Sequence, residues 1–386
     1  MPQVVEVSAR EVEPSPPRRV RAVHALYLLL AGLPVGLWAA RAGHPTLAFL
    51  ASGLALVPLA YVIGLSTEAL AMRLGHGLGS VVLATLSNSV ELLIGYLALA
   101  KGLPRVVQAE ITGSILANIL LVLGTAMLAG GLKHRTQTFG GKAANVQATL
   151  LFLAVLALFV PAFAPILVKD HPVDVNRLSI VLSVGLLVTY GLGLVFSLRT
   201  HRHLFEPGTE AAAASHGPSV IHAPGTHTHA QRSVWSLRKA LVVLALATIA
   251  AAFAAAALTD TISDAARELG WTDLFVGAIV LAIVANAAEH WSAVSLAWKN
   301  RMNASLQVAT ASSIQIALFV APLLVFLSQP FAQPLSLAFP LLEVVAMGAS
   351  VLVLNLVAYD GESNWFEGAL LLMVYLILGT AFFLLP

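Results

Sequence analysis

The stretch GSVVLATLSNSVE at residues 79–91 recurs as GAIVLAIVANAAE at residues 277–289, without a gap. Each copy is apolar except near its end, where an asparagine precedes a glutamate by three residues. The pairs are Asn88 with Glu91 and Asn286 with Glu289. Residues three apart lie on one face of a helix, so each copy presents a carboxamide beside a carboxylate. A carboxylate within a hydrophobic span is costly and indicates function.

The repeat continues beyond these two stretches at the same offset. Lys101, Thr112 and Ser114 match Lys299, Thr310 and Ser312. Both glutamates fall about 14 to 16 residues into their apolar spans, at or a little past the middle of the hydrocarbon layer. Ionisable groups at matching depths in the two halves of one chain indicate a single shared site.

The composition is that of a protein that crosses a membrane several times. Of its 386 residues, 58% are hydrophobic and 10% are charged, whereas soluble domains carry about 25% charged residues. The mean hydropathy is +0.87. The net charge of +2 comes from basic residues in loops, so no nucleic-acid partner is expected. The chain has no cysteine, which excludes disulfides and thiolate metal sites.

A spanning helix needs about 20 mostly apolar residues, and the sequence contains eleven such stretches. They lie near residues 24–40, 46–71, 77–100, 106–131, 146–167, 177–198, 236–257, 273–298, 305–328, 334–357 and 364–385. The paired stretches fall in the third and eighth spans. An odd separation of five spans means that the second copy crosses the membrane upside down, and inverted repeats with a midplane site are typical of secondary transporters. We therefore expect an all-α polytopic membrane protein.

Four regions follow from this pattern. The expected boundaries are 1–43 for an N-terminal tail and first helix, 44–199 for the first repeat, 200–234 for a hydrophilic loop, and 235–386 for the second repeat. The loop holds six of the twelve histidines and is rich in Ala, Gly, Pro and Ser. This composition favours a flexible linker, with metal sensing as the alternative.

The distribution of basic residues predicts the orientation. With the N-terminus inside, fifteen of the 21 Lys and Arg residues fall in inside segments and six in outside segments. The positive-inside rule therefore favours an inside N-terminus and an outside C-terminus. The short tail and compact length favour a plasma (inner) membrane over a vacuolar one. The lipid bilayer and a divalent cation are the expected partners, and the sequence does not decide between a monomer and a homo-oligomer.

The paired glutamates predict a site for cations or protons. Two ionised carboxylates in one low-dielectric cavity carry a charge of about −2 and repel each other. One divalent cation or two protons would neutralise them, and hard oxygen ligands suit Ca²⁺ and also Mn²⁺. If the site can pass the apolar barrier only when its charge is neutralised, the empty carrier cannot return. Transport then becomes obligatory exchange. Ca²⁺ or Mn²⁺ and H⁺ are then cargo, and no resident cofactor is expected.

Further polar side chains lie near the two pairs in the sequence. The expected supporting groups are Gln108, Ser114, Ser312, Ser313 and Gln315, with Thr112, Asn118 and Thr310 close by. The alternative for each hydroxyl is helix packing or a bond to the preceding turn.

Several other ionisable residues lie in or near the spans. Glu68 is expected to line an inside vestibule, or else to pair with Arg73. His290 is expected to relay protons, or else to pack with a hydrogen bond. Glu110 suggests a rim or vestibule, and Glu343 is an intramembrane acid without a repeat mate.

The stretches Ser87–Leu92 and Ala285–His290 resemble the cation/proton exchanger (CAX) family of the Ca²⁺:cation antiporter superfamily, whose members carry GNAAEL-type and GNAAEH-type motifs there. Similar segments are RVVQA from Arg105, GSILAN from Gly113, SSIQ from Ser312 and LRTH from Leu198. The resemblance covers nearly the whole chain from about Leu47.

The resemblance implies one N-terminal helix followed by two inverted five-helix repeats. It implies Ca²⁺ efflux or sequestration driven by inward proton flow. It assigns ion binding and protonation to Glu91 and Glu289. Asn88, Asn286 and nearby backbone carbonyls, including those of Ser87 and Ala285, are expected to assist. Glu68 matches an acidic position that opens the family's first repeat.

The sequence departs from the family pattern at the site itself. Ser87 and Ala285 replace the glycine that usually precedes each asparagine, and Ala311 replaces a glycine in the ninth span. Glycine eases the interruption of a helix, so the depth of the break and the size of the pocket are left open. These positions bear on the choice between Ca²⁺ and Mn²⁺.

The leading hypothesis is therefore a proton-coupled divalent cation antiporter and not an enzyme. A Na⁺-driven Ca²⁺ exchanger is the alternative within the same superfamily. A cation channel is disfavoured, because channels usually build their filters from rings of subunits. An intramembrane hydrolase is also disfavoured, because the spans lack paired histidines and a Ser/His/Asp set.

Overall fold

The structure is a computed structural model that describes residues 27–74, 79, 82–83, 85–167, 174–201 and 235–384. The N-terminal tail and nearly all of the His-rich loop at 200–234 lie outside the described residues. What we expected of that loop therefore stays a prediction.

The first half of the described chain is helical apart from one short strand. In chain order its elements are η1 (Leu29–Ala31), α2 (Gly32–Ala42), α3 (Pro45–Leu74), α5 (Ser89–Ala100), α6 (Pro104–Leu116), η2 (Ala117–Val122), α7 (Leu123–His134), β1 (Thr136–Thr138), α8 (Gly141–Leu167), α9 (Val175–Val195) and η3 (Phe196–Thr200). The element η1 is a 3₁₀ turn, whereas η2 and η3 are π-helical.

The second half is also helical apart from one short strand. Its elements are α10 (Leu237–Leu269), α11 (Asp273–Phe275), η5 (Val276–Leu281), α12 (Ala282–Ala285), α13 (Ala287–Trp298), α14 (Met302–Gln315), η6 (Ile316–Val320), α15 (Ala321–Ser328), α16 (Leu341–Val357), β2 (Glu362–Asn364) and α17 (Trp365–Leu384). The elements η5 and η6 are π-helical. Such turns within membrane helices are often found at functional sites.

Seven described helices are long and apolar enough to cross a membrane, and a bent pair at Asp273–Ala285 and Ala287–Trp298 adds an eighth. The three other expected spans correspond to shorter apolar helices at Leu29–Ala42, Ser89–Ala100 and Leu341–Val357. Length and composition therefore establish a multi-pass helical membrane protein. They do not by themselves confirm the expected count of eleven.

The matching elements of the two halves point in opposite directions. Helices α5 and α13 have the same length, and both run from the site towards a lysine, Lys101 and Lys299 respectively. A continuous span of 31 residues, Pro104–His134, begins beside Lys101. At its far end Lys133 Nζ donates to the Trp298 carbonyl oxygen over 2.9 Å. The two lysines therefore lie at opposite ends of a helix about 45 Å long.

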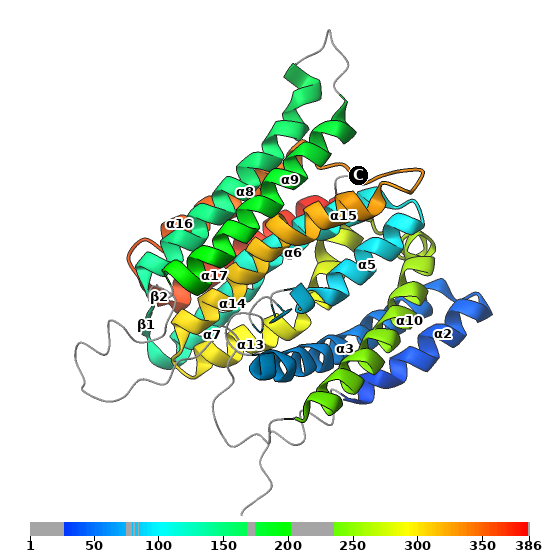
Figure 1. The fold of residues 1–386 in the computed structure, drawn as a ribbon, viewed down its shortest axis with the longest axis horizontal. Helices are drawn as coiled ribbons and strands as arrows, with labels where there is room; N and C mark the ends of the chain where they lie inside the picture. The colour runs from blue at the N-terminus through cyan, green and yellow to red at the C-terminus, as the bar shows by residue number, and fades with distance from the viewer. Residues whose placement is uncertain are drawn as a thin grey trace, which may run out of the picture.

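The helices form three groups (Figure 1). Helices α2, α3 and α10 pack side by side on one flank, and α8 and α9 lie on the opposite flank. The interrupted helices and the long spans α6–α7 and α14–α15 run between them. One hydrophobic core joins α3 and α10 to the central helices, and a larger one joins the central helices to the other flank. The site therefore lies between two packed layers.

The segment between α15 and α16 corrects one expected boundary. The tenth span was expected from residue 334, but α16 begins at Leu341, after Pro334 and Pro340. The preceding chain is extended although Leu335 and Leu337 are fully buried. Non-helical backbone within a membrane must have its polar groups satisfied by protein. Side chains supply these bonds: Gln108 Nε2 donates to the carbonyls of Ser336 and Ala338, and the hydroxyls of Ser328 and Ser179 accept from the backbone amides of Leu335 and Leu337.

A short two-stranded sheet joins the two halves. Strands β1 and β2 pair antiparallel, with Thr136 opposite Asn364, and so connect the two halves.

Large apolar side chains are exposed along the outer helices, among them Val181, Leu192, Leu246, Phe253, Leu356 and Leu376. This surface suits the hydrocarbon of a bilayer.

Candidate ion-binding site

The helix breaks at the two asparagines have the same backbone geometry. Asn88 has φ −95° and ψ 24°, and Asn286 has φ −93° and ψ 16°. Between α12 and α13 the chain bends by 61° at Asn286. These negative φ values are accessible to any residue. The break therefore forms without a glycine, although Ser87 and Ala285 precede the two asparagines.

Each glutamate is the third residue of the half-helix that follows its break. Glu91 lies in the first turn of α5 and Glu289 in the first turn of α13. The N-terminus of a helix favours negative charge, because its free N–H groups and its dipole point there. Glu91 is 3% exposed, whereas Glu289 is half-buried. The two carboxylates are near enough for their charges to repel each other.

Glu91 has no compensating partner in the described part of the chain. Both of its carboxylate oxygens are buried, and neither accepts a hydrogen bond from a described residue. A buried carboxylate without a hydrogen bond or a cation is strongly unfavourable. The side chain is therefore suited to hold an ion or a proton that arrives from outside.

The first asparagine is held by the second half of the chain. Asn88 Nδ2 donates to Gln315 Oε1 over 2.6 Å, and the Ser87 hydroxyl donates to the same oxygen over 3.2 Å. Gln315 ends α14, where the π-helical turn η6 begins. Ser87, Asn88 and Gln315 thus form a hydrogen-bonded cluster between the two halves.

The second asparagine is held by the first half. Asn286 Nδ2 donates to Ser114 Oγ over 3.0 Å. Asn118 Nδ2 donates to Asn286 Oδ1 over 3.3 Å and to Ser312 Oγ over 2.8 Å. Sequence reasoning placed Asn118 nearby but not among the site residues. Its position four residues after Ser114, on the same helix face, was the available signal.

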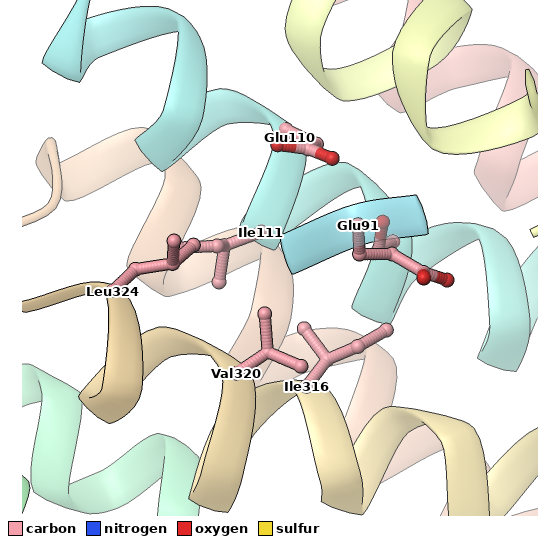
Figure 2. A pocket seen from close by; sticks show the side chains of 7 residues that line it. Glu91, Glu110, Ile111, Ile316, Val320 and Leu324 are labelled. Atoms are coloured by element: carbon pink, nitrogen blue, oxygen red, sulfur yellow. The ribbon is translucent and has the colours of Figure 1, made fainter. Parts of the chain in front are cut away.

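A small cavity adjoins Glu91 (Figure 2). Its volume is about 10 Å³, close to the minimum that one water molecule needs. Glu91, Glu110 and Ser114 form its polar lining, and Ile111, Ile316, Val320 and Leu324 form its apolar lining. Figure 2 shows Glu91 and Glu110 on different sides of this space. Glu110 is 3% exposed, which does not fit a rim and leaves the vestibule alternative as a prediction.

The remaining predicted residues differ in whether their side chains reach this site. Ala285 is buried and offers only backbone atoms, while the Ser313 hydroxyl bonds the Ala309 carbonyl of its own helix. Gln108 bonds the extended segment before α16 and accepts a 2.6 Å hydrogen bond from Arg105. It is therefore not among the side chains that bond the two asparagines. Glu68 lies half-buried on α3.

His290 follows Glu289 and is half-buried. Its Nε2 atom has no hydrogen-bond partner among the described residues. The packing alternative, which required a hydrogen bond, is thus without support at this nitrogen.

A second polar cluster surrounds Glu343. This residue is fully buried in the first turn of α16. It accepts a 2.7 Å hydrogen bond from Thr112 Oγ1, and Arg105 Nη2 lies 3.4 Å from its other oxygen. Thr112 and Arg105 both belong to α6, so the cluster fixes the start of α16 against α6.

The described residues contain no group of three or more His, Asp or Glu side chains placed to hold a metal ion together. A cation at Glu91 and Glu289 would therefore need the carboxamides, hydroxyls and backbone carbonyls of the two breaks as well. Oxygen donors of this mixed kind suit hard divalent cations.

Two interrupted helices that run in opposite directions, each with a carboxylate at its break, define a membrane transporter of the inverted-repeat class. The chain belongs to the sodium/calcium exchanger protein family, whose sequence profile matches residues 44–199 and 239–384.

Named relatives cover most of the chain. It is 40% identical to the Ca²⁺/H⁺ antiporter of Aphanothece halophytica over 88% of this chain and 90% of that protein. It is 37% identical to the Ca²⁺/H⁺ antiporter ChaA of Bacillus subtilis, over 93% and 98%. The solved structure of native YfkE superimposes with a TM-score of 0.76 at 34% identity, covering 93% of this chain and all of that one.

Proposed function

We propose that this protein is a secondary antiporter that exchanges Ca²⁺ for protons by alternating access, with Glu91 and Glu289 binding either the cation or protons. The observation that carries the proposal is the buried Glu91 carboxylate, whose two oxygens have no partner among the described residues. The charge of Glu289 repels it. The names of the Aphanothece and Bacillus relatives, both Ca²⁺/H⁺ antiporters, support the choice of ions.

Charge compensation links the two ions. When both carboxylates are ionised, a divalent cation between them offsets their repulsion, and protons offset it when the cation leaves. The apolar side chains around the cavity oppose passage of an uncompensated charge. The site can therefore change its exposure when it holds cargo of either kind and cannot do so when it is bare. This requirement makes the transport an exchange.

The hydrogen bonds across the two halves support the same mechanism. Asn88 donates to Gln315, and Asn286 donates to Ser114, so each break is hydrogen-bonded to the opposite half. A movement of one half relative to the other changes both sets of bonds. The carboxamide oxygens and the carbonyls at Ser87 and Ala285 then supply further ligands for the cation as the site closes around it.

The test is Ca²⁺ uptake into proteoliposomes under an imposed pH gradient. Wild-type protein is expected to accumulate Ca²⁺ as protons move the other way. Glu91→Gln and Glu289→Gln keep the side-chain shape but remove the charge, and each is expected to abolish the exchange without loss of the folded protein. The exposed Glu362→Gln is the matched control and is expected to transport normally. Near-normal Ca²⁺ transport by either site variant would reject the assignment.

The driving ion and the physiological cation are tested in the same vesicles. The match to the sodium/calcium exchanger family makes Na⁺ the alternative coupling ion. Replacing the pH gradient by a Na⁺ gradient is expected to stop Ca²⁺ uptake, and sustained uptake would favour the Na⁺-driven alternative. Mn²⁺ satisfies the same oxygen donors. Competition between Ca²⁺ and Mn²⁺ under a fixed pH gradient determines which ion the site prefers.

The proposed location is a plasma membrane, with the N-terminus inside and the C-terminus outside. The excess of Lys and Arg in the segments assigned to the inside supports this orientation. Reporter domains fused to each end test it, because a reporter that requires the cytoplasm is expected to be active at the N-terminus and inactive at the C-terminus. The reverse pattern would overturn the orientation.

A further inference from the structure

A third buried acid adjoins the site, and neither the repeat nor the proposed exchange accounts for it. Glu110 lies on α6, is 3% exposed, and lines the same cavity as Glu91 and Ser114. Its Oε1 atom is buried without a hydrogen-bond partner among the described residues. Its charge also acts on Glu91. A buried carboxylate in this condition needs a compensating group from outside the protein.

The contact with Gly95 shows where the Glu110 carboxylate lies along α5. This glycine is one helical turn beyond Glu91 on α5, and a Cβ there would stand 3.6 Å from Glu110 Oε2. Helix α5 runs from Glu91 through Gly95 to Lys101. At a rise of 1.5 Å per residue, Gly95, and with it the Glu110 carboxylate, lies about 6 Å further than Glu91 towards the Lys101 end of α5. It therefore lies between the Glu91 site and that surface.

The approach at this level is narrow. The same Cβ at Gly95 would come within 2.7 Å of Leu324 Cδ1, so α5 and α15 are in close contact there. Leu324 and Val320 face the two acids across a cavity of about 10 Å³. A hydrated divalent cation is too large for this space. An ion that passes must give up water, and a carboxylate oxygen replaces the lost hydration.

The second half has no acid at the matching position. The residues that match Glu110 and Gly95 are Val308 and Ala293. Ala293 is fully buried, and Val308 packs against the larger hydrophobic core. The acid is therefore present on the approach from the Lys101 end and is replaced by an apolar side chain on the approach from the Lys299 end.

We propose that Glu110 is a cation-binding carboxylate on the path between the Lys101 surface and Glu91, and that it makes cation binding stronger from that face of the membrane. The proposal rests on the proposed function, since it assumes a transported divalent cation. Glu110 binds the cation before or after Glu91 does, because the described acids do not form a group of three around one ion. A residue reached from one face alone changes the apparent affinity at that face alone.

The test compares Glu110→Gln with wild type in right-side-out and inside-out vesicles, with Ca²⁺ as the probe. The half-saturating Ca²⁺ concentration is expected to rise about tenfold at the Lys101 face, equivalent to 1.4 kcal/mol, and to stay unchanged at the Lys299 face. Asp264→Asn is the matched control. It removes one negative charge from an exposed position on α10, near the Asp260 that pairs with Lys101, and is expected to leave both values unchanged.

Glu110→Asp keeps the charge on a shorter side chain and is expected to give a smaller increase at the same face. It also provides the measurement if Glu110→Gln does not fold, as judged by size-exclusion chromatography. The proposal would be overturned if the variants kept the wild-type half-saturating Ca²⁺ concentration at both faces. It would also be overturned if that concentration rose equally at both faces. Absence of Ca²⁺ exchange in the wild type would instead refute the proposed function.

Discussion

Asn88 donates a 2.6 Å hydrogen bond to Gln315, and this bond joins the interrupted helix of the first half to the π-helical region of the second. Asn286 makes the reciprocal connection through its 3.0 Å bond to Ser114. The two acceptors are not repeat mates, since Ser114 matches Ser312 and Gln315 matches Ala117. The halves thus achieve a similar linkage with different residues.

Replacing Gln315 with leucine is expected to weaken cation transport. The substitution removes the 2.6 Å hydrogen bond that the buried Asn88 carboxamide donates across the two halves, at a cost of about 1 kcal/mol. Because this amide belongs to the break before Glu91, we expect the half-saturating Ca²⁺ concentration to rise about tenfold. The measurement is Ca²⁺ uptake into proteoliposomes. Gln329→Leu, in the loop directly after α15, removes hydrogen bonds to Val325 and Asn176 away from the site and serves as control. An equal effect of both changes would contradict the expectation.

A methyl group at Gly113 is expected to destabilise the protein. A Cβ at this position would overlap the backbone of Ala278, because α6 and η5 cross at close range there. Overpacking of this kind costs about 1–3 kcal/mol. We therefore expect Gly113→Ala to lower the melting temperature in detergent. Gly64→Ala meets no atom within 4 Å and should leave the melting temperature unchanged or slightly raised. A Gly113→Ala protein as stable as wild type would show that the two helices separate at little cost.

The sequence was sufficient to predict the membrane class and to select the two acidic positions as candidates, because both depend on local and repeated patterns. Hydropathy identifies apolar spans, and Glu91 and Glu289 stand out as charges within them. Their equal spacing from Asn88 and Asn286 is itself a sequence pattern, and it indicates that the two acids form a pair. The extended chain before α16 was missed, since Leu335 and Leu337 contribute to hydropathy whether or not they are helical.

The connections between halves could not be predicted from the sequence. The role of Asn118 depends on Asn286 and Ser312, which lie more than 160 residues away. The sequence left Glu110 between a rim and a vestibule, because its position near the end of a span can be counted from the sequence. That α15 covers this residue through Leu324 could not be counted. Gln108 matched a family segment, yet its partners are carbonyls of the extended chain at Ser336 and Ala338.

Asn118 and Asn286 are expected to act as one unit. Asn118→Ala removes the donor that bridges Asn286 and Ser312, and Asn286→Ala removes the group that Asn118 orients. Because both changes break the same junction, the double variant should transport Ca²⁺ about as well as the weaker single variant, with an interaction energy of about 0.5–3 kcal/mol. Initial rates of Ca²⁺ uptake provide the measurement. Asn355→Ala, which breaks a bond within α16 alone, is the control. Effects that simply add would show that the two amides act separately.

Thr112 and Glu343 are expected to be coupled in stability, because their 2.7 Å hydrogen bond is fully buried between α6 and α16. Thr112→Val leaves the buried carboxyl without this donor, and Glu343→Gln changes the acceptor and its contact with Arg105. We expect each single change to destabilise the protein and the pair to cost less than the sum, with a coupling energy of about 1 kcal/mol. Thermal unfolding of the four proteins in detergent measures it. Ser350→Ala, seven residues further along α16, breaks a bond to its own helix and should combine additively with Thr112→Val. The same coupling with Ser350 would mean that the effect comes from helix α16 as a whole and not from this contact.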